Sequence, residues 1–189
     1  AFTPHYRCIS YSRRYNHPNR NDMPSPDHSA LVEAQDLLGL MDALALPRAA
    51  LVASSYGAFV ALALAVAQPA RVQAVVAVEP AMMGYAQFSA RGRAEWQRFR
   101  KTVVEPANAA FGAGDDAQGA LLMTGGIHHA GSSATEGTQL QRRLQNARAM
   151  RMLALSSNEF PLLPPQSLAG LAMPVLLISG ELTPPVHAE

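Results

Sequence analysis

The sequence predicts an α/β fold with a mostly parallel sheet, flanking helices and a helical insertion. Three short apolar runs are typical of buried strands, at residues 48–54, 73–80 and 173–181. Helical patterns lie before and after the first of these runs, which is the rhythm of a doubly wound sheet. The long stretch between the second and third runs instead shows helical patterns with charged and aromatic residues interleaved.

The first helix is predicted over residues 29–44, where leucines recur on one face and Pro47 stops the pattern. The acidic residues of this segment, Glu33 among them, are expected away from that face. The strand at 48–54 is continuously apolar, as expected for a parallel sheet covered on both faces. The second predicted helix, 56–67, is alanine-rich and small enough to pack closely against such a sheet.

Between that strand and the second helix, residues 53–57 read A-S-S-Y-G and predict a nucleophile elbow. A serine hydroxyl is a weak nucleophile, so it needs an exposed position on a tight strand-to-helix turn, near a base and near backbone N–H groups. Small residues two positions to either side let strand and helix approach each other. This pattern of small flanking residues fits only if Ser55 is its central residue, with Ala53 and Gly57 at the flanks. If Ser54 were central, Val52 and Tyr56 would occupy the flanking positions. Ser55 is therefore the predicted nucleophile, and the backbone N–H of Tyr56 the predicted oxyanion donor.

With this elbow and the strands around it, the chain resembles serine-nucleophile, capped, esterase-like members of the α/β-hydrolase family. Residues 6–15, followed by a loop rich in proline and asparagine, resemble the family's strand preceding the elbow unit. The resemblance implies a partial α/β-hydrolase fold in three parts. Residues 1–79 would form the N-terminal part of the core, 80–172 a helical cap or lid insertion, and 173–189 a return to the core.

The resemblance also implies an acid and a histidine that follow the serine in the chain. The usual acid position, three residues past the glycine that ends the strand at Gly180, holds Thr183 in this sequence. Other members take the acid from the end of the strand after the elbow helix, where Glu79 stands, at the carboxyl edge where α/β sites gather. Glu79 is the candidate acid, Glu181 is the alternative, and a carboxylate outside this chain stays open.

The family's histidine lies after a further strand, and His187 comes too early by a whole α-β unit. We therefore expect the catalytic histidine outside this chain. No His-Gly-type loop precedes Arg7, so the second oxyanion donor is missing too. The resemblance implies truncation at both ends, including a strand before Phe2 that would sit beside the elbow strand. Since its loss would leave an open slot in the sheet, the 189 residues alone are not expected to form a stable, active enzyme.

Within the expected cap, helices are predicted over residues 91–105 and 139–155, joined by a glycine-rich stretch at 124–131. Several thioether and aromatic side chains either line an apolar substrate pocket or simply pack the cap helices together, and packing is the preferred interpretation for most of them. They are Met82, Met83, Trp96, Phe99, Met123, Met150 and Met152.

Composition limits the function classes. The chain has 189 residues, of which 49% are hydrophobic, and this excludes a disordered class. Lysine and arginine number 15 against 14 acidic residues, a formal net charge of +1, so no charged face points to nucleic acid or a membrane. The expected partner is a small, largely apolar substrate with no cofactor, and the oligomeric state stays open.

The single cysteine, Cys8, excludes an internal disulfide and is expected as a small buried hydrophobe, which fits a reducing, cytoplasmic compartment. The apolar stretch 58–67 is far short of a membrane span. Arg13 and Arg14 either steer an anionic substrate or, as is usual for loop arginines, are solvated.

The adjacent pair His128 and His129 suggests a metal site, but neighbouring histidines cannot converge as ligands four residues apart on a helix do. We therefore expect no metal. Three histidines precede the elbow and are expected at the surface: His5, His17 and His28.

Three function classes follow. The first is a serine-dependent hydrolase in which Ser55 attacks an ester or related carbonyl. The second is another reaction on the same scaffold, perhydrolysis or carbon–carbon bond hydrolysis. The third is a non-catalytic binding protein or an inactive fragment. Dehalogenase and epoxide-opening members use aspartate as nucleophile, so a serine argues against those reactions.

Overall fold

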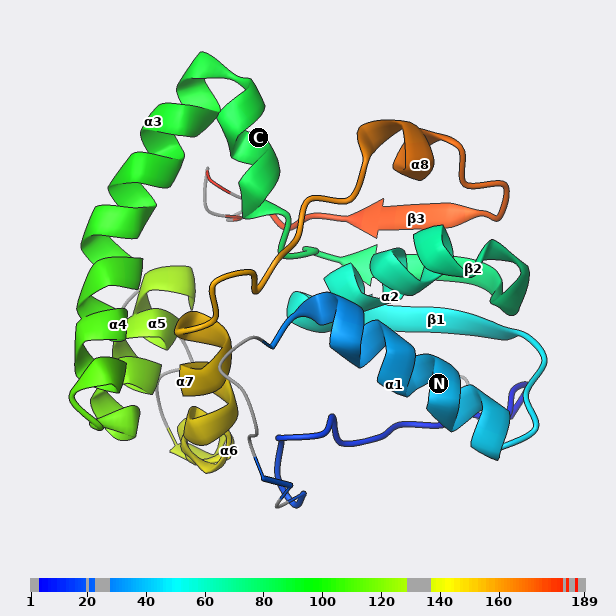
Figure 1. Ribbon diagram of the computed structural model, residues 1–189, viewed down its shortest axis with the longest axis horizontal. Helices are drawn as coiled ribbons and strands as arrows, with labels where there is room; N and C mark the ends of the chain where they lie inside the picture. Colours follow the sequence, from blue (N-terminus) through cyan, green and yellow to red (C-terminus); the bar gives the residue numbers. More distant parts are fainter. Residues whose placement is uncertain are drawn as a thin grey trace.

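The computed structural model describes residues 4–19, 21–22, 28–128, 137–181, 183 and 186. A parallel three-stranded sheet runs in the order β1 (Ala49–Ser54), β2 (Val72–Val78), β3 (Val175–Ile178). In this sheet Leu51 pairs with Val75, which in turn pairs with Val175. Figure 1 shows helices α3 to α7 gathered on the side toward which the β3 arrow points. The carboxyl ends of the strands therefore face the helical region, as expected for an α/β fold with a helical insertion.

Helix α1 spans Ala30–Ala43 and helix α2 spans Tyr56–Ala67. The second has the bounds expected from the sequence, and the first differs by one residue at each end. Every residue of α2 from Ala58 to Ala65 is buried, because α2 lies between α1 and the sheet (Figure 1). A helix that is apolar all round is stable only in such a position.

The sheet in the described residues is covered on one face only, so the expectation of a strand buried on both faces is wrong. Burial alternates along β1, with Val52 64% exposed. All four residues of β3 are exposed, Leu177 by 60%. Helices α1 and α2 lie on the same side of the sheet, so every second side chain of β1 points away from them.

The N-terminal segment was expected to contribute a strand over residues 6–15, and this expectation is wrong. Residues 7–13 have no regular secondary structure, and Cys8 is exposed rather than buried. A strand needs a neighbouring backbone to complete its hydrogen bonds. Here the segment is attached to α1 through the side chains of Arg13 and Arg14 instead.

The cap region consists of short helices connected by turns. In chain order after β2 they are a 3₁₀ helix Met83–Phe88, α3 (Ala90–Phe99), a π-helical segment Arg100–Val104, α4 (Glu105–Gly112), α5 (Asp116–His128), α6 (Gly137–Gln145) and α7 (Ala147–Ala154), with α8 (Pro165–Ala169) before β3. A 3₁₀ turn, Pro69–Arg71, precedes β2. Among the described residues, no helix combines the length and apolarity needed to cross a bilayer.

The predicted glycine-rich connector at 124–131 is wrong for its first part, because residues 124–128 continue α5. Two glycines of α5 are used for close packing. A Cβ at Gly119 would lie 2.5 Å from the Phe111 ring, and one at Gly126 would lie 2.3 Å from Val103. Small residues therefore let α5 approach α4 and the π-helical segment, an arrangement that glycine composition alone does not distinguish from a loop.

Candidate active site

Ser55 occupies the turn between β1 and α2. Its φ is 51° and its ψ is −125°, a conformation that side chains disfavour, and the residue is exposed. Four backbone hydrogen bonds hold it there. The Ser55 N–H donates to the Val78 carbonyl at 2.8 Å, and the Ser55 carbonyl accepts from Ala58 (3.0 Å), Phe59 (3.2 Å) and Ala81 (3.3 Å). A strained residue that its surroundings hold in place is typical of functional sites.

The small flanking residues of the turn are in contact. A Cβ added at Gly57 would lie 3.8 Å from the Cβ of Ala53, an ordinary van der Waals distance. Larger side chains at these two positions would collide. Ser54 is exposed as well, but it ends β1 in regular register with Val78. The left-handed backbone therefore distinguishes Ser55 from its neighbour.

Tyr56 begins α2, so its N–H is among the first N–H groups of a helix, which have no acceptor within the helix. The positive end of the helix dipole also lies here and favours a negative charge. The Tyr56 ring is buried, edge-on to Phe160 with centroids 5.4 Å apart and with the Arg13 guanidinium carbon 4.5 Å from its centroid. Burial raises the pKa of its phenol. The backbone of Tyr56 thus faces the turn while its ring is held in the core.

Glu79 follows the last residue of β2 and also has a positive φ, 46°. Because Ser54 pairs with Val78, the next residues along the two strands, Ser55 and Glu79, leave the sheet at the same edge. The Glu79 N–H donates to the Ile178 carbonyl at 2.8 Å. The structure therefore brings together the predicted nucleophile and the candidate acid at the carboxyl end of adjacent strands.

Two groups that sequence reasoning did not assign to the site contact the Glu79 carboxylate. The Gly180 N–H donates to Oε1 at 3.2 Å, and the Thr183 hydroxyl donates to the same oxygen at 2.5 Å. Glu181, the alternative acid, lies in the turn after β3 and is exposed. The sequence gives one hint of these contacts: Thr183 occupies the position, three residues after Gly180, where the resemblance implied the acid.

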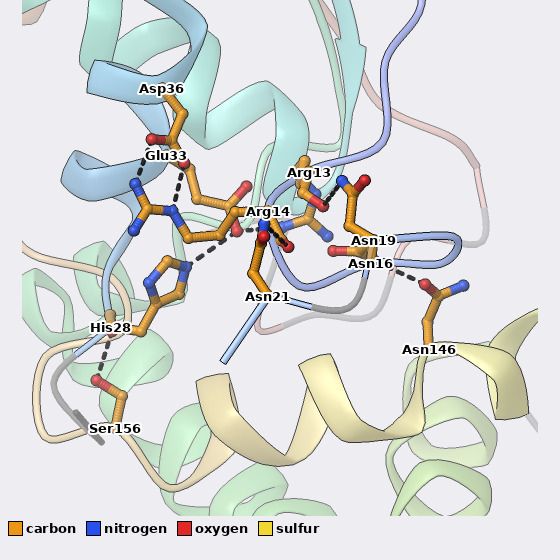
Figure 2. A network of polar contacts seen from close by, with 10 residues as sticks. All are labelled: Arg13, Arg14, Asn16, Asn19, Asn21, His28, Glu33, Asp36, Asn146 and Ser156. Atoms are coloured by element: carbon orange, nitrogen blue, oxygen red, sulfur yellow. Dashed lines mark hydrogen bonds and ion pairs between the residues drawn. The ribbon is translucent and has the colours of Figure 1, made fainter. Parts of the chain in front are cut away.

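A polar network joins the N-terminal segment to α1 and to the region of Asn146 and Ser156 (Figure 2). Glu33 Oε1 accepts from Arg13 and contacts Nε2 of His28, both at 3.0 Å, and Arg14 pairs with Asp36 through two hydrogen bonds. Glu33 is 3% exposed and His28 4% exposed. The surface position expected for His28 is therefore wrong. Arg13 and Arg14, expected to be solvated or to steer a substrate, are instead paired with carboxylates of α1.

Glu33 can be buried because the N-terminal segment lies over α1 and brings a cationic side chain to its carboxylate. A buried carboxylate is tolerated only when it is paired. Asn16 adds a bond to Asn146 at 3.0 Å, and the Ser156 hydroxyl donates to the His28 carbonyl at 2.5 Å. The same Arg13 lies over the Tyr56 ring, so the network reaches the residue next to Ser55.

Comparison with known proteins decides the family. A model of the alpha/beta hydrolase family matches residues 1–189. The chain belongs to the alpha/beta hydrolase family. Its fold is accordingly a partial α/β-hydrolase fold, as the elbow and its surrounding strands predicted.

Two solved structures are similar to this chain, and the first of them supports the fold. The carboxylesterase CesB from Bacillus subtilis is 21% identical, with a TM-score of 0.52, and the match covers 84% of this chain and 51% of CesB. A probable hydrolytic enzyme from Pseudomonas aeruginosa PAO1 is 19% identical, with a TM-score of 0.42 and the same two coverages. The chain thus spans about half the length of these structures. A search of curated proteins returned no match.

Within the part of the chain that the structure describes, no histidine side chain is placed as a base for the candidate nucleophile Ser55. His28 is engaged with Glu33, while His5 and His17 are exposed in the N-terminal segment. The His128 side chain, His129 and His187 lie outside the described residues. No group of three histidine, cysteine or acidic side chains within the described ranges is arranged to hold a metal.

The apolar residues considered for the pocket mostly pack within the cap. Phe99 and Met152 are buried, and Trp96 stacks on Phe99 with centroids 6.2 Å apart. Met83 and Met123 pack on a cluster formed by Ala86, Phe99, Val103 and Val186. These contacts hold the cap helices together next to the carboxyl end of the sheet.

Replacing Glu33 with glutamine is expected to destabilise the protein by about 3–5 kcal/mol, because it removes the counter-charge of Arg13 from a buried site. Urea unfolding of the full-length protein measures this. Glu105→Gln is the matched control, since the Arg100–Glu105 pair is exposed and worth less than about 1 kcal/mol. An equal loss in both variants would contradict the account of the network.

Glu159 is expected to make the stability of the protein depend on pH. Burial raises the pKa of its carboxyl from 4.5 to about 7. Between these two values the folded protein keeps a proton that the unfolded chain has released, so stability falls as pH rises through this window. Glu159→Gln should stabilise the protein by roughly 3 kcal/mol at about pH 8, and by almost nothing at about pH 4, since a pKa unit is worth about 1.4 kcal/mol. Melting temperatures that differ equally at both pH values would contradict this.

Proposed function

We propose that this chain carries the nucleophile and the acid of a serine-dependent hydrolase that acts on an ester or related carbonyl of a small, largely apolar molecule. The observation that supports the proposal most strongly is the backbone of Ser55. An exposed serine in a left-handed turn, at the carboxyl end of a parallel strand and directly before a helix, has the geometry of an activated hydroxyl.

In the proposed reaction the Ser55 hydroxyl attacks the carbonyl carbon, and the oxygen of the tetrahedral intermediate is held by the Tyr56 N–H. The N-terminus of α2 adds a favourable field for that negative charge. One such donor is worth about 10²- to 10³-fold in rate. Collapse of the intermediate breaks the bond between the carbonyl carbon and the leaving oxygen, and the alcohol departs with the proton that the general base took from Ser55. Water then attacks the acyl group and gives its proton to the same base, so that the carboxylic acid leaves and Ser55 recovers its hydroxyl.

The proton of Ser55 passes to a histidine in this mechanism. In the family that histidine follows a further strand, beyond the acid loop, and we propose the same for the whole protein. Glu79 orients its imidazole and stabilises the charged form. We assign the acid to Glu79 rather than Glu181 because Glu79 and Ser55 directly follow the paired ends of adjacent strands, whereas Glu181 is an exposed turn residue.

The experiment is a substrate panel on the full-length hydrolase. p-Nitrophenyl esters of increasing acyl length should be hydrolysed, and prior treatment with a fluorophosphonate should abolish the turnover. Peracid formation in acetate and hydrogen peroxide, and cleavage of a β-diketone, test the other reactions of the scaffold. Peracid formation or diketone cleavage without ester hydrolysis would replace the proposed reaction, and absence of both turnover and labelling would refute an enzymatic role.

A further inference from the structure

We propose that Thr183 is a positioning residue for the Glu79 carboxylate, and that together with the Gly180 N–H it holds the acid in the orientation its histidine needs. This inference rests on the proposed function, in which Glu79 is the acid. It assigns a role to the loop after β3, which brings its own donors to the end of β2.

The hydrogen-bond pattern indicates where the Thr183 hydroxyl proton goes. Thr183 Oγ1 lies 2.5 Å from Glu79 Oε1 and 2.8 Å from the Gly180 carbonyl, yet a hydroxyl donates only one proton. The Gly180 carbonyl already accepts the Thr183 N–H at 3.2 Å. A charged acceptor also makes the stronger bond. The hydroxyl proton therefore belongs to the Glu79 carboxylate.

Gly180 completes the arrangement. Its N–H donates to the same oxygen, Oε1, at 3.2 Å, so two donors from one loop converge on one atom. A Cβ at position 180 would lie 3.1 Å from Oε1 and 3.6 Å from Thr183 Oγ1. That is tighter than an ordinary carbon–oxygen contact, so any larger residue at 180 would press against the carboxylate.

The length of the Glu79 side chain explains why hydrogen-bond donors are needed to fix its carboxylate. Its side chain has one more methylene than aspartate and therefore more rotamers to lose when it is fixed. Its backbone is already held, by the N–H bond to Ile178 and a positive φ of 46°. Fixing Oε1 from the neighbouring strand's loop restrains the remaining torsions. An acid acts by holding an imidazole in one tautomer and orientation, so freedom of its carboxylate would lower the rate rather than substrate affinity.

The test uses the full-length hydrolase with p-nitrophenyl acetate and measures kcat, KM and melting temperature. Thr183→Val, which keeps the shape but loses the hydroxyl, should lower kcat by about 10- to 100-fold with KM unchanged, as expected for one hydrogen bond to a charged group. Thr183→Ser restores the hydroxyl and should recover most of the rate. Thr102→Val is the matched control, because the Thr102 hydroxyl bonds only a carbonyl within the cap.

A double variant separates positioning from a structural role. In a Glu79→Gln background, Thr183→Val should cause little further loss, because the negative charge whose position Thr183 fixes is already gone. An undiminished loss there, or equal losses in Thr183→Val and Thr183→Ser, would overturn the inference. If Glu79→Gln is inactive while Thr183→Val has wild-type kcat, the inference fails and the proposed acid stands. If Glu79→Gln keeps full activity, the proposed acid and this inference both fail.

Discussion

Ser55→Ala is expected to abolish ester hydrolysis by the full-length protein, lowering kcat on the order of 10⁵- to 10⁶-fold. The loss is this large because no other group can form the acyl intermediate, so the remaining rate reflects binding and the oxyanion donor alone. Initial rates with p-nitrophenyl acetate at high enzyme concentration measure it. KM and the melting temperature should change little, since Ser55 is exposed and its backbone is held by main-chain hydrogen bonds.

Ser54→Ala is the matched control. Ser54 is also an exposed serine, one residue away, but its backbone belongs to β1. We expect its kcat within about threefold of the wild type, because a surface substitution away from the reacting atoms changes little. A large fall in kcat in Ser54→Ala, or substantial turnover by Ser55→Ala, would contradict the assignment of the nucleophile.

Glu79→Gln is expected to lower kcat by about 10³- to 10⁴-fold. Glutamine keeps the size of the side chain and can still accept the Gly180 and Thr183 hydrogen bonds at its oxygen, so the fold should persist. It cannot offer a negative charge to the imidazolium that forms during the reaction. Steady-state kinetics with thermal melting as a folding check measure the effect.

Glu181→Gln is the control for that substitution. Glu181 is an exposed turn residue two positions from Thr183, and we expect near wild-type kcat after its replacement. If Glu181→Gln shows the larger loss and Glu79→Gln the smaller, the acid has been assigned to the wrong carboxylate.

The elbow was predictable because its signals are local. An apolar run, two small residues around Ser55 and an alanine-rich stretch after it determine where β1 ends and where α2 begins. The family match confirms the fold class drawn from them. Side-chain periodicity and small-residue spacing depend on neighbours within a few positions, and a single sequence contains that information.

The network around Glu33 was not predictable for the opposite reason. Helical periodicity places this residue off the leucine face of α1, and that much is a local property. Its burial depends on Arg13 and His28, which reach it from segments outside the helix. The error over residues 6–15 has the same origin, because the resemblance implied a strand there but a strand also needs a neighbouring backbone to complete its hydrogen bonds.

The choice between acids also depended on tertiary structure. Sequence alone left Glu79, Glu181 and a carboxylate outside this chain open, since both glutamates stand at the ends of predicted strands. The register of β2 with its neighbours decides what each can reach. It places Glu79 at the same edge of the sheet as Ser55 and within hydrogen-bond distance of the Gly180 N–H and the Thr183 hydroxyl, while Glu181 is an exposed turn residue.

The most direct test of the central claim is to locate the adduct of a fluorophosphonate on the full-length hydrolase by tandem mass spectrometry. Only an activated serine reacts rapidly with such a probe. We predict a single phosphonylated residue, Ser55, with the adduct absent from the Ser55→Ala variant and unchanged in Ser54→Ala. An adduct on Ser54 or on another serine, or an intact and folded protein that takes up no label, would contradict the account.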